Sequence, residues 1–263
     1  DAFSPKNQDL DPVAVGSILA TIGLAADDRP APVFRRQDGS LARVDRRAEL
    51  TQDGPLPGDA PVIAQVSRWD RLKDPAGVLR CFSEHLRHPS AHLVVAGPSV
   101  AEVADDPEGA EVLAEVERLR ASLPDEVRAR THLASLPMDD VEENAAMVNA
   151  IQRHADVVLQ KSLAEGFGLT VAEAMWKARP VVAGRVGGIQ DQIIDGVSGV
   201  LVDDPADLAS VAGAIDGLLD DPDRARAIGQ AARQRVLDEF LGSRHLVQYM
   251  NLIQVMLHKE GKA

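Results

Sequence analysis

Two glutamates and two glycines lie close together in the stretch A-E-G-F-G-L-T-V-A-E-A-M, residues 164–175. The stretch follows the apolar run D-V-V-L-Q-K and leads into a predicted helix that begins near Gly168. The first turn of a helix presents unpaired N–H groups and the positive end of the helix dipole. Because Gly166 and Gly168 have no side chains, an anion such as a phosphate could approach these amides closely.

The glutamates add a second kind of chemistry to this stretch. Glu165 lies before the helix and Glu173 one to two turns inside it, so both could accept hydrogen bonds from sugar or ribose hydroxyls. The alternative is a strand-to-helix turn in which Glu165 is an incidental acidic residue. The stretch also differs from the nicotinamide-nucleotide fingerprint G-x-G-x-x-G/A, because Val171 stands where a small residue is needed and the strand before it comes late in the chain. An oxidoreductase is therefore disfavoured.

Two further segments follow other predicted strands and could contribute to the same site. The segment V-S-R-W-D-R-L-K-D-P carries Arg68 and Lys73. Together, their two positive charges match the two negative charges of a pyrophosphate. The segment G-R-V-G-G-I-Q-D places Gly187 and Gly188 at the start of a short helix, where their amides could meet sugar hydroxyls. A solvated basic loop and a sharp glycine turn are the simpler interpretations of these segments when each is taken alone.

The elements that must position these residues are regular from Pro61 onward. The runs V-I-A-Q-V-S, H-L-V-V-A-G, T-H-L-A-S-L, D-V-V-L-Q-K and P-V-V-A-G-R predict five strands, and G-V-L-V is a candidate for a sixth. Helices are expected at about 75–88, 107–123, 139–154, 168–178, 205–220, 222–240 and 243–258. This alternation indicates an α/β fold, a Rossmann-like parallel sheet with helices on both faces. In such sheets ligands bind at the carboxyl ends of the strands, where all three segments are expected to lie.

Residues 1–59 differ from this regular pattern. A short helix is expected after Asp11, with Pro12 at its first position, followed by a hairpin that turns at Asp38 and Gly39. A stretch rich in Pro and Gly, D-G-P-L-P-G-D-A-P, then resembles a linker. We interpret residues 1–59 as an interdomain connector or appendage without an independent core, and residues 60–263 as the main domain.

The composition excludes several classes of function. The formal net charge of −13 argues against generic binding to nucleic acid or to anionic membranes, and no run is long enough for a membrane span. Cys81 is the single cysteine and is expected to lie in the core, without a disulfide. His85 and His88 share a helix face but lack a third ligand, so no metal site is expected. Since no signal peptide opens the chain, we expect a cytoplasmic protein, and since residue 1 is Asp, a longer natural chain.

Four segments in one order give the sequence a family resemblance. The segments S-R-W-D-R-L-K, E-G-F-G-L-T-V-A-E-A-M-W, R-P-V-V-A-G-R-V-G-G-I and D-G-V-S-G-V-L-V resemble the C-terminal, nucleotide-sugar-binding half of a retaining glycosyltransferase of family four, which has the GT-B fold. The longer run D-V-V-L-Q-K-S-L-A-E-G-F-G-L-T-V-A-E-A-M-W is similar to trehalose synthase of the glycosyltransferring type and to retaining trehalose phosphorylase. The opening D-A-F-S-P-K-N and the A-D-D-P-E-G near residue 106 fit the same subgroup.

The resemblance implies a role for each candidate residue. Arg68 and Lys73 would neutralise the departing diphosphate, and Glu165 would hold hydroxyls of the transferred hexose; these three are the implied catalytic residues. Glu173 would bind the ribose. The remaining donor-binding residues would be Gly166, Phe167, Gly168, Leu169, Gly187 and Gly188, while Asp191 replaces the Glu often found in the wider family. Catalysis would rest on positioning and electrostatic stabilisation, without a metal ion or other cofactor.

The implied function is trehalose synthesis from ADP-glucose or UDP-glucose and glucose. The alternatives are a fragment of a retaining trehalose phosphorylase and a noncatalytic nucleotide- or sugar-binding module. A GT-B enzyme has two Rossmann-like domains, and the sequence predicts the strands of only one. We therefore expect the N-terminal acceptor domain of the same enzyme as a partner, and we expect the chain to be inactive without it. A homodimer is a further expectation. Residues 135–138 are expected to contact the base. Apolar residues of the last predicted helix form a stripe that either packs normally, which we favour, or is left partly uncovered: Leu246, Tyr249, Met250, Ile253 and Met256.

Overall fold

A computed structural model describes most of the chain: residues 4–26, 33–100 and 107–242, and beyond them residues 244, 249–251 and 253–254. Most of the predicted helix 243–258 and part of the A-D-D-P-E-G segment lie outside the described residues. Of the predicted apolar stripe, Tyr249, Met250 and Ile253 are described, and each is more than half exposed. The expectation of a normally packed stripe is therefore wrong for these three residues.

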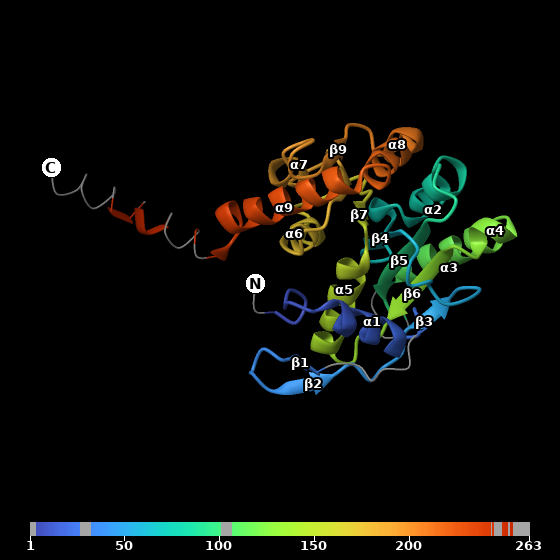
Figure 1. Cartoon of the computed structure of the whole chain (residues 1–263), viewed down its shortest axis with the longest axis horizontal. Coiled ribbons are helices and arrows are strands. Elements are labelled where there is room, and N and C mark those ends of the chain that lie inside the picture. The colour runs from blue at the N-terminus through green and yellow to red at the C-terminus, as the bar shows by residue number, and fades with distance from the viewer. Residues whose placement is uncertain are drawn as a thin grey trace.

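A seven-stranded sheet forms the centre of the molecule (Figure 1), and it confirms all six predicted strands. Its strands, in spatial order, are β3 (Glu49–Thr51), β6 (Thr131–Leu136), β5 (His92–Pro98), β4 (Val62–Val66), β7 (Val157–Gln160), β8 (Val181–Gly184) and β9 (Val200–Val202). All pairings are parallel except that of β3 with β6. The chain moves from β4 to one side and then returns to place β7 on the other side. The order therefore reverses between β4 and β7, which is where open α/β sheets bind ligands.

Helices cover both faces of the sheet, as the sequence predicts. They are α1 (Pro12–Thr21), α2 (Pro75–Glu84), α3 (Pro107–Ala121), α4 (Asp125–Arg128), α5 (Val141–His154), α6 (Leu169–Trp176), α7 (Ile189–Gln192), α8 (Leu208–Leu219) and α9 (Pro222–Glu239). Helix α2 ends four residues earlier than predicted, because the backbone N–H of Arg87 donates to Asp216 on α8 and Pro89 follows. The short elements β3 and α4 are not predicted from the sequence, whereas the short helix α7 begins directly after Gly187 and Gly188, as predicted.

Alternate residues of each strand face opposite layers. Val62 and Ala64 pack in the layer that contains α1, α5 and α6, whereas Ile63 between them packs in the layer that contains α2, α3 and α8. Helix α9 contributes to both layers, since Ala225 and Ile228 belong to the second and Ala232 and Val236 to the first. Cys81 is buried in the second layer, as predicted, and burial raises the pKa of its thiol to about 12.

Residues 4–26 and 33–59 pack onto the rest of the domain. The Asp11 side chain accepts a hydrogen bond from Ala14 N at 2.7 Å and caps α1, as predicted. Figure 1 shows α1 beside α5, with the hairpin of β1 (Val33–Arg35) and β2 (Leu41–Arg43) next to them. The predicted turn of this hairpin is confirmed, with Gly39 in the left-handed region at φ 87°. Since buried residues of α1 belong to the same core cluster as those of α5, this region shares the domain's core; the boundary at residue 59 stays a prediction.

Two buried histidines lie where β5 and β6 begin. His92 Nδ1 and His132 Nε2 are 2.9 Å apart, and His132 Nδ1 lies 3.0 Å from the side-chain oxygen of Gln52. Burial lowers the pKa of His132 to about 4 and also lowers the pKa of His92. Because a folded-state pKa below the ordinary value means that the folded protein resists protonation, both rings stabilise the fold only while they are neutral.

We therefore expect the free energy of unfolding to fall as the pH is lowered through the ordinary histidine range toward the folded pKa of His132. Between about pH 7.5 and about pH 5 the loss attributable to His132 should be about 2 kcal/mol. Urea unfolding at both pH values measures it. His132→Gln, which keeps a hydrogen-bonding group but does not titrate, should reduce the difference, and the same change at the more exposed His85 should leave it unaltered. An equal pH effect in wild type and His132→Gln would contradict this assignment.

Candidate functional site

The predicted site residues gather at the carboxyl ends of β4, β7 and β8. Arg68 and Lys73 follow β4, residues 165–169 follow β7, and Gly187 and Gly188 follow β8. These strands include the pair at which the strand order reverses. The three segments that the sequence singles out are therefore neighbours in space, as expected.

The closest contact in this group joins Lys73 to Glu165. The ammonium Nζ of Lys73 lies 2.5 Å from Glu165 Oε2, and each side chain is 15% exposed. The other carboxylate oxygen of Glu165 accepts a hydrogen bond from Gly166 N at 3.0 Å. A cation and a carboxylate thus meet at the edge of the sheet, and both remain accessible from solvent.

A buried network beneath this ion pair positions Lys73. The fully buried amide of Gln65, on β4, donates to Lys73 O at 2.8 Å and accepts from Lys161 N at 3.0 Å. The next residue, Asp74, adopts a left-handed conformation with φ 47°, caps α2 through Gly77 N, and pairs with the ammonium of Lys161. Since the Lys161 side chain is only 1% exposed, this ion pair is largely removed from water.

The glycine-rich loop presents the N-terminus of α6. Gly168 is the N-cap residue in a left-handed conformation, φ 85°, and no side chain caps the helix. Among the described residues, the amides of Phe167, Gly168, Leu169 and Thr170 have no hydrogen-bond acceptor. Phe167 and Leu169 are 48% and 67% exposed. The loop therefore offers free N–H groups beside the Lys73–Glu165 pair, with apolar side chains at its rim.

The second glycine pair supports the first. Gly188 N donates to Gly166 O at 2.7 Å, and a Cβ at Gly187 would lie 1.7 Å from Glu165 O. The buried side chain of Gln192, on α7, donates to Phe167 O. Arg235 of α9 holds α7 in turn, since it donates to the carbonyl oxygens of Asp191 and Gln192 at 2.8 and 2.6 Å. Gly187 and Gly188 thus act on the loop that carries Glu165.

Glu173 lies on α6, close to Lys6. Its Oε1 is 3.4 Å from the Lys6 ammonium, and its Oε2 is buried without a hydrogen-bond donor among the described residues. The neighbouring Asn7 accepts from Trp176 Nε1 through its backbone oxygen and from Lys177 Nζ through its side chain. Burial lowers the pKa of Lys177 to about 7. Lys6 and Asn7 of the D-A-F-S-P-K-N segment therefore contact the helix of the E-G-F-G-L-T-V-A-E motif.

Arg68 is not brought into contact with this cluster. Its side chain is 67% exposed and pairs with Asp70 at 3.0 Å. A nearby contact stabilises the loop that carries it, because Trp69 Nε1 donates to Pro98 O at 2.9 Å. Across the described ranges, no group of three or more His, Cys, Asp or Glu side chains has a metal-binding arrangement. Lys73 lies in the cluster and Arg68 at its exposed rim, so both are placed to meet an anion at this edge.

The family model for glycosyl transferases group 1 matches residues 46–235, which is more than half of the chain. This chain belongs to the group 1 glycosyl transferases. Trehalose synthase of Rubrobacter xylanophilus is 39% identical over 221 residues, 83% of this chain and 49% of that protein. The predicted family is therefore confirmed, and the chain spans about half the length of this relative.

Solved structures of glycosyltransferases share the fold. Sucrose-phosphate synthase from Thermosynechococcus elongatus has a TM-score of 0.62 and 27% identity, with 78% of this chain and 47% of that chain covered. The Anabaena protein Alr3699/HepE in complex with UDP and glucose has a TM-score of 0.65 over 96% of this chain and 55% of its own. At 17% sequence identity, this likeness indicates a shared fold and nothing more. The predicted Rossmann-like half of a GT-B fold agrees with these neighbours.

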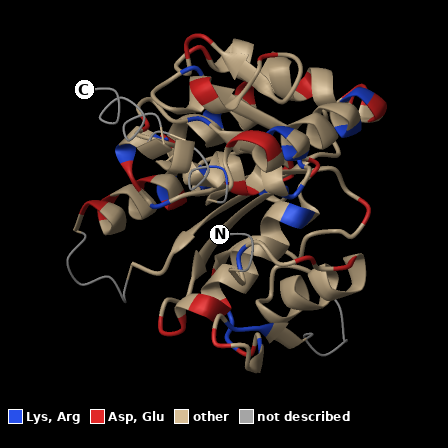
Figure 2. Cartoon of the chain, turned by 90° about the vertical axis from the view of Figure 1, so that its left-hand side faces the viewer, with Lys and Arg blue, Asp and Glu red and all other residues tan. Residues whose placement is uncertain are grey.

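The charged residues of this glycosyl transferase are mixed along the described chain. In the ribbon view of Figure 2, positions of Lys and Arg are interspersed with positions of Asp and Glu. Among the helices that the structure describes, none is both long enough and apolar enough to cross a membrane.

Several residues of the site are not identified from the sequence. Gln65, Lys161 and Gln192 are polar residues that lie within or directly beside apolar runs, and each is buried. A polar residue that interrupts an otherwise apolar buried strand must find a hydrogen-bond partner, so this interruption is the signal that could have identified Gln65. The partners themselves come from other loops, and the sequence pattern does not name them.

The contact between Gly187 and Glu165 O gives a direct test of this loop packing. Gly187→Ala should lower the free energy of unfolding by on the order of 3 kcal/mol, because the new Cβ meets backbone and φ is 49°. Gly196→Ala is the matched control, since Gly196 has φ 72° but no neighbouring atom within 4 Å, so it should cost only about 1 kcal/mol. Urea unfolding of both variants measures the difference. Equal losses would show that the two loops are not held in contact.

The Lys161–Asp74 pair gives a second test. Lys161→Met should destabilise the protein by about 3 kcal/mol, because it leaves a partly buried carboxylate without its partner. In an Asp74→Asn background, which keeps the cap on α2, the same change should cost clearly less. Denaturant unfolding of the four proteins gives the coupling between the two residues. Strictly additive losses would mean that the pair does not interact.

Proposed function

We propose that this chain is the donor-binding half of a retaining glucosyltransferase that forms trehalose from a nucleotide-glucose and glucose. Membership in the group 1 glycosyl transferases and the 39% identity to a trehalose synthase support the reaction class. The observation that carries the site assignment is the contact between Lys73 and Glu165. The complete reaction needs the acceptor domain expected on the N-terminal side.

This contact matches the chemistry of a nucleotide sugar. The hexose is bonded directly to the terminal phosphate of the diphosphate, so a residue that binds that phosphate and one that binds the hexose must be neighbours. Lys73 supplies the cation for the phosphate, and Glu165 supplies acceptors for sugar hydroxyls. When the donor binds, the Lys73 ammonium donates hydrogen bonds to its phosphate oxygens as well as to Glu165. The Glu165 carboxylate then accepts hydrogen bonds from the sugar hydroxyls.

The free amides at the start of α6 complete the phosphate site. Their N–H groups and the helix dipole favour a negative charge next to Lys73. Glu173 is assigned to the ribose, because its Oε2 lacks a donor among the described residues and a ribose hydroxyl would supply one. Arg68 reaches the diphosphate from the rim after it leaves Asp70. Residues 135–138 are assigned to the base, at the end of β6.

The proposed reaction breaks the bond between the sugar C1 and the diphosphate oxygen. The acceptor hydroxyl forms the new bond on the same face of C1, and its proton passes to an oxygen of the departing diphosphate, so the anomeric configuration is retained. Lys73 and the α6 amides stabilise the charge on the leaving group, and Glu165 fixes the hexose. The proposal includes no metal ion. Phe167 and Leu169, exposed at the rim, would face the acceptor domain.

Titration with nucleotide tests the assignment. The chain should bind ADP or UDP, and the corresponding glucose derivative, in a saturable way measurable by calorimetry. Lys73→Met should weaken binding by at least about tenfold, because a charge-assisted hydrogen bond is lost. Arg71→Met is the matched control: Arg71 lies in the same short helical turn but pairs with Glu115 on α3, so its loss should leave affinity unchanged.

The alternatives give different results in the same experiments. Binding of trehalose and phosphate without any nucleotide would favour a trehalose phosphorylase, and nucleotide binding without turnover in an N-terminally extended chain supplied with glucose would favour a noncatalytic module. Absence of saturable nucleotide binding, or equal affinity in wild type and Lys73→Met, would overturn the proposed donor site.

A further inference from the structure

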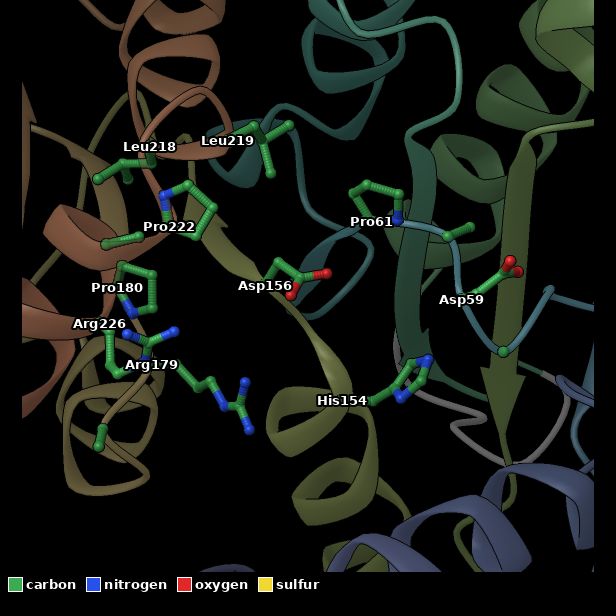
Figure 3. Close-up of a pocket in the computed structure, with 14 residues that line it drawn as sticks. Asp59, Pro61, His154, Asp156, Arg179, Pro180, Leu218, Leu219, Pro222 and Arg226 are labelled. Carbon is green, nitrogen blue, oxygen red and sulfur yellow. The ribbon is translucent and has the colours of Figure 1, made fainter.

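A pocket of about 450 Å³ opens at the edge of the sheet opposite to the donor site (Figure 3). Pro61, Asp156 and Pro180 line it, and these residues directly precede β4, β7 and β8. The donor site follows the carboxyl ends of the same strands. The pocket and the donor site therefore lie at opposite ends of these strands.

The walls of the pocket differ in chemistry. One wall is apolar and is formed by the end of α8, with Leu218 and Leu219, and by the start of α9, with Pro222 and Ala225. Two cationic side chains, Arg179 and Arg226, also line it, and Figure 3 shows both on the side of Pro180. The carboxylate of Asp59 lies on the opposite side in this view, with Asp156 between them.

Arg179 has hydrogen-bonding capacity that the described residues do not use. Its Nη1 donates to Ala155 O at 3.1 Å, but its Nε is buried without an acceptor, and it forms no ion pair in the described part of the chain. His154, which also lines the pocket, likewise has a buried Nε2 without a partner among the described residues. A role as cap for the C-terminal carbonyls of α5 explains the Nη1 contact only. Buried polar atoms are normally paired, so Arg179 and His154 retain hydrogen-bonding capacity that no described residue uses.

The backbone fixes Arg179 in this position. Ala178 adopts a left-handed conformation, φ 55°, that is unfavourable for a residue with a side chain. A Cβ at Gly229 of α9 would lie 2.2 Å from Ala178 O, so α9 packs tightly against this turn. The turn is thus held in an unfavourable conformation by its surroundings, and the guanidinium is presented to the pocket.

We propose that this pocket binds a small polyol that carries an oxyanion, a phosphate or a carboxylate, at a site independent of the donor site. Arg179 and Arg226, which both line the pocket, take the oxyanion. Arg226 is available for this role, because its partner Asp223 is 91% exposed and contributes little. His154, Asp156 and Asp59 meet the hydroxyls, which can donate to carboxylates where a second anionic group could not.

Titration with a matched series of small molecules tests the proposal. Glycerol 3-phosphate and glycerate each pair a polyol with one oxyanion, and glycerol is the uncharged control. Calorimetry should show saturable binding of at least one of the two anions and none of glycerol, and the stronger of the two identifies the preferred oxyanion. The imidazole signals of His154, assigned by their loss in His154→Asn, should shift in an NMR titration with the same ligand.

Variants separate this pocket from the donor site. Arg226→Ala should weaken binding roughly tenfold, whereas Arg224→Ala, which removes an arginine from the same exposed turn of α9 outside the pocket lining, should leave it unchanged. Lys73→Met should also leave it unchanged. Arg179→Gln should abolish binding in a protein whose circular dichroism is that of wild type. Absence of saturable binding by both anions, or binding that is lost in Lys73→Met and unaffected by Arg226→Ala, would overturn the proposal.

Discussion

The arrangement of the donor site depends on one buried side-chain amide, that of Gln65. It lies on β4, at the point where the strand order reverses, and it bonds at once to the backbone of the loop after β4 and to that of the segment after β7. Because an unpaired amide in the core is costly, neither segment can move away without leaving Gln65 unsatisfied. The backbones that carry Lys73 and Glu165 are thereby held at a fixed separation.

The features that the sequence predicts well are those that depend on local chemistry. Apolar runs identify the six parallel strands, and the glycines and charges beside them identify the sheet edge at which Lys73 and Glu165 meet. Short elements such as β3 and α4 have too few residues for a periodic pattern. The Gln65 network could not be predicted, because its partners come from separate loops. The charge of Arg68 is evident in the sequence, but its exposure and its pairing with Asp70 are not.

The N-terminal segment has a closer relation to the site than a connector requires. Lys6 contacts Glu173, and Asn7 holds two residues near the end of the same helix. The segment therefore shapes the surface of α6 on which the ribose is proposed to rest.

Helix α9 has contacts at both edges of the sheet. Its first turns line the pocket of Figure 3. Near its other end, Arg235 donates to backbone carbonyls of α7, and Gln192 of α7 in turn donates to the glycine-rich loop. Eighteen residues of α-helix span about 27 Å and resist bending along that length. Between these two ends, the close packing of Gly229 against Ala178 O fixes where the helix lies on the domain, so one helix sets the position of parts of both edges.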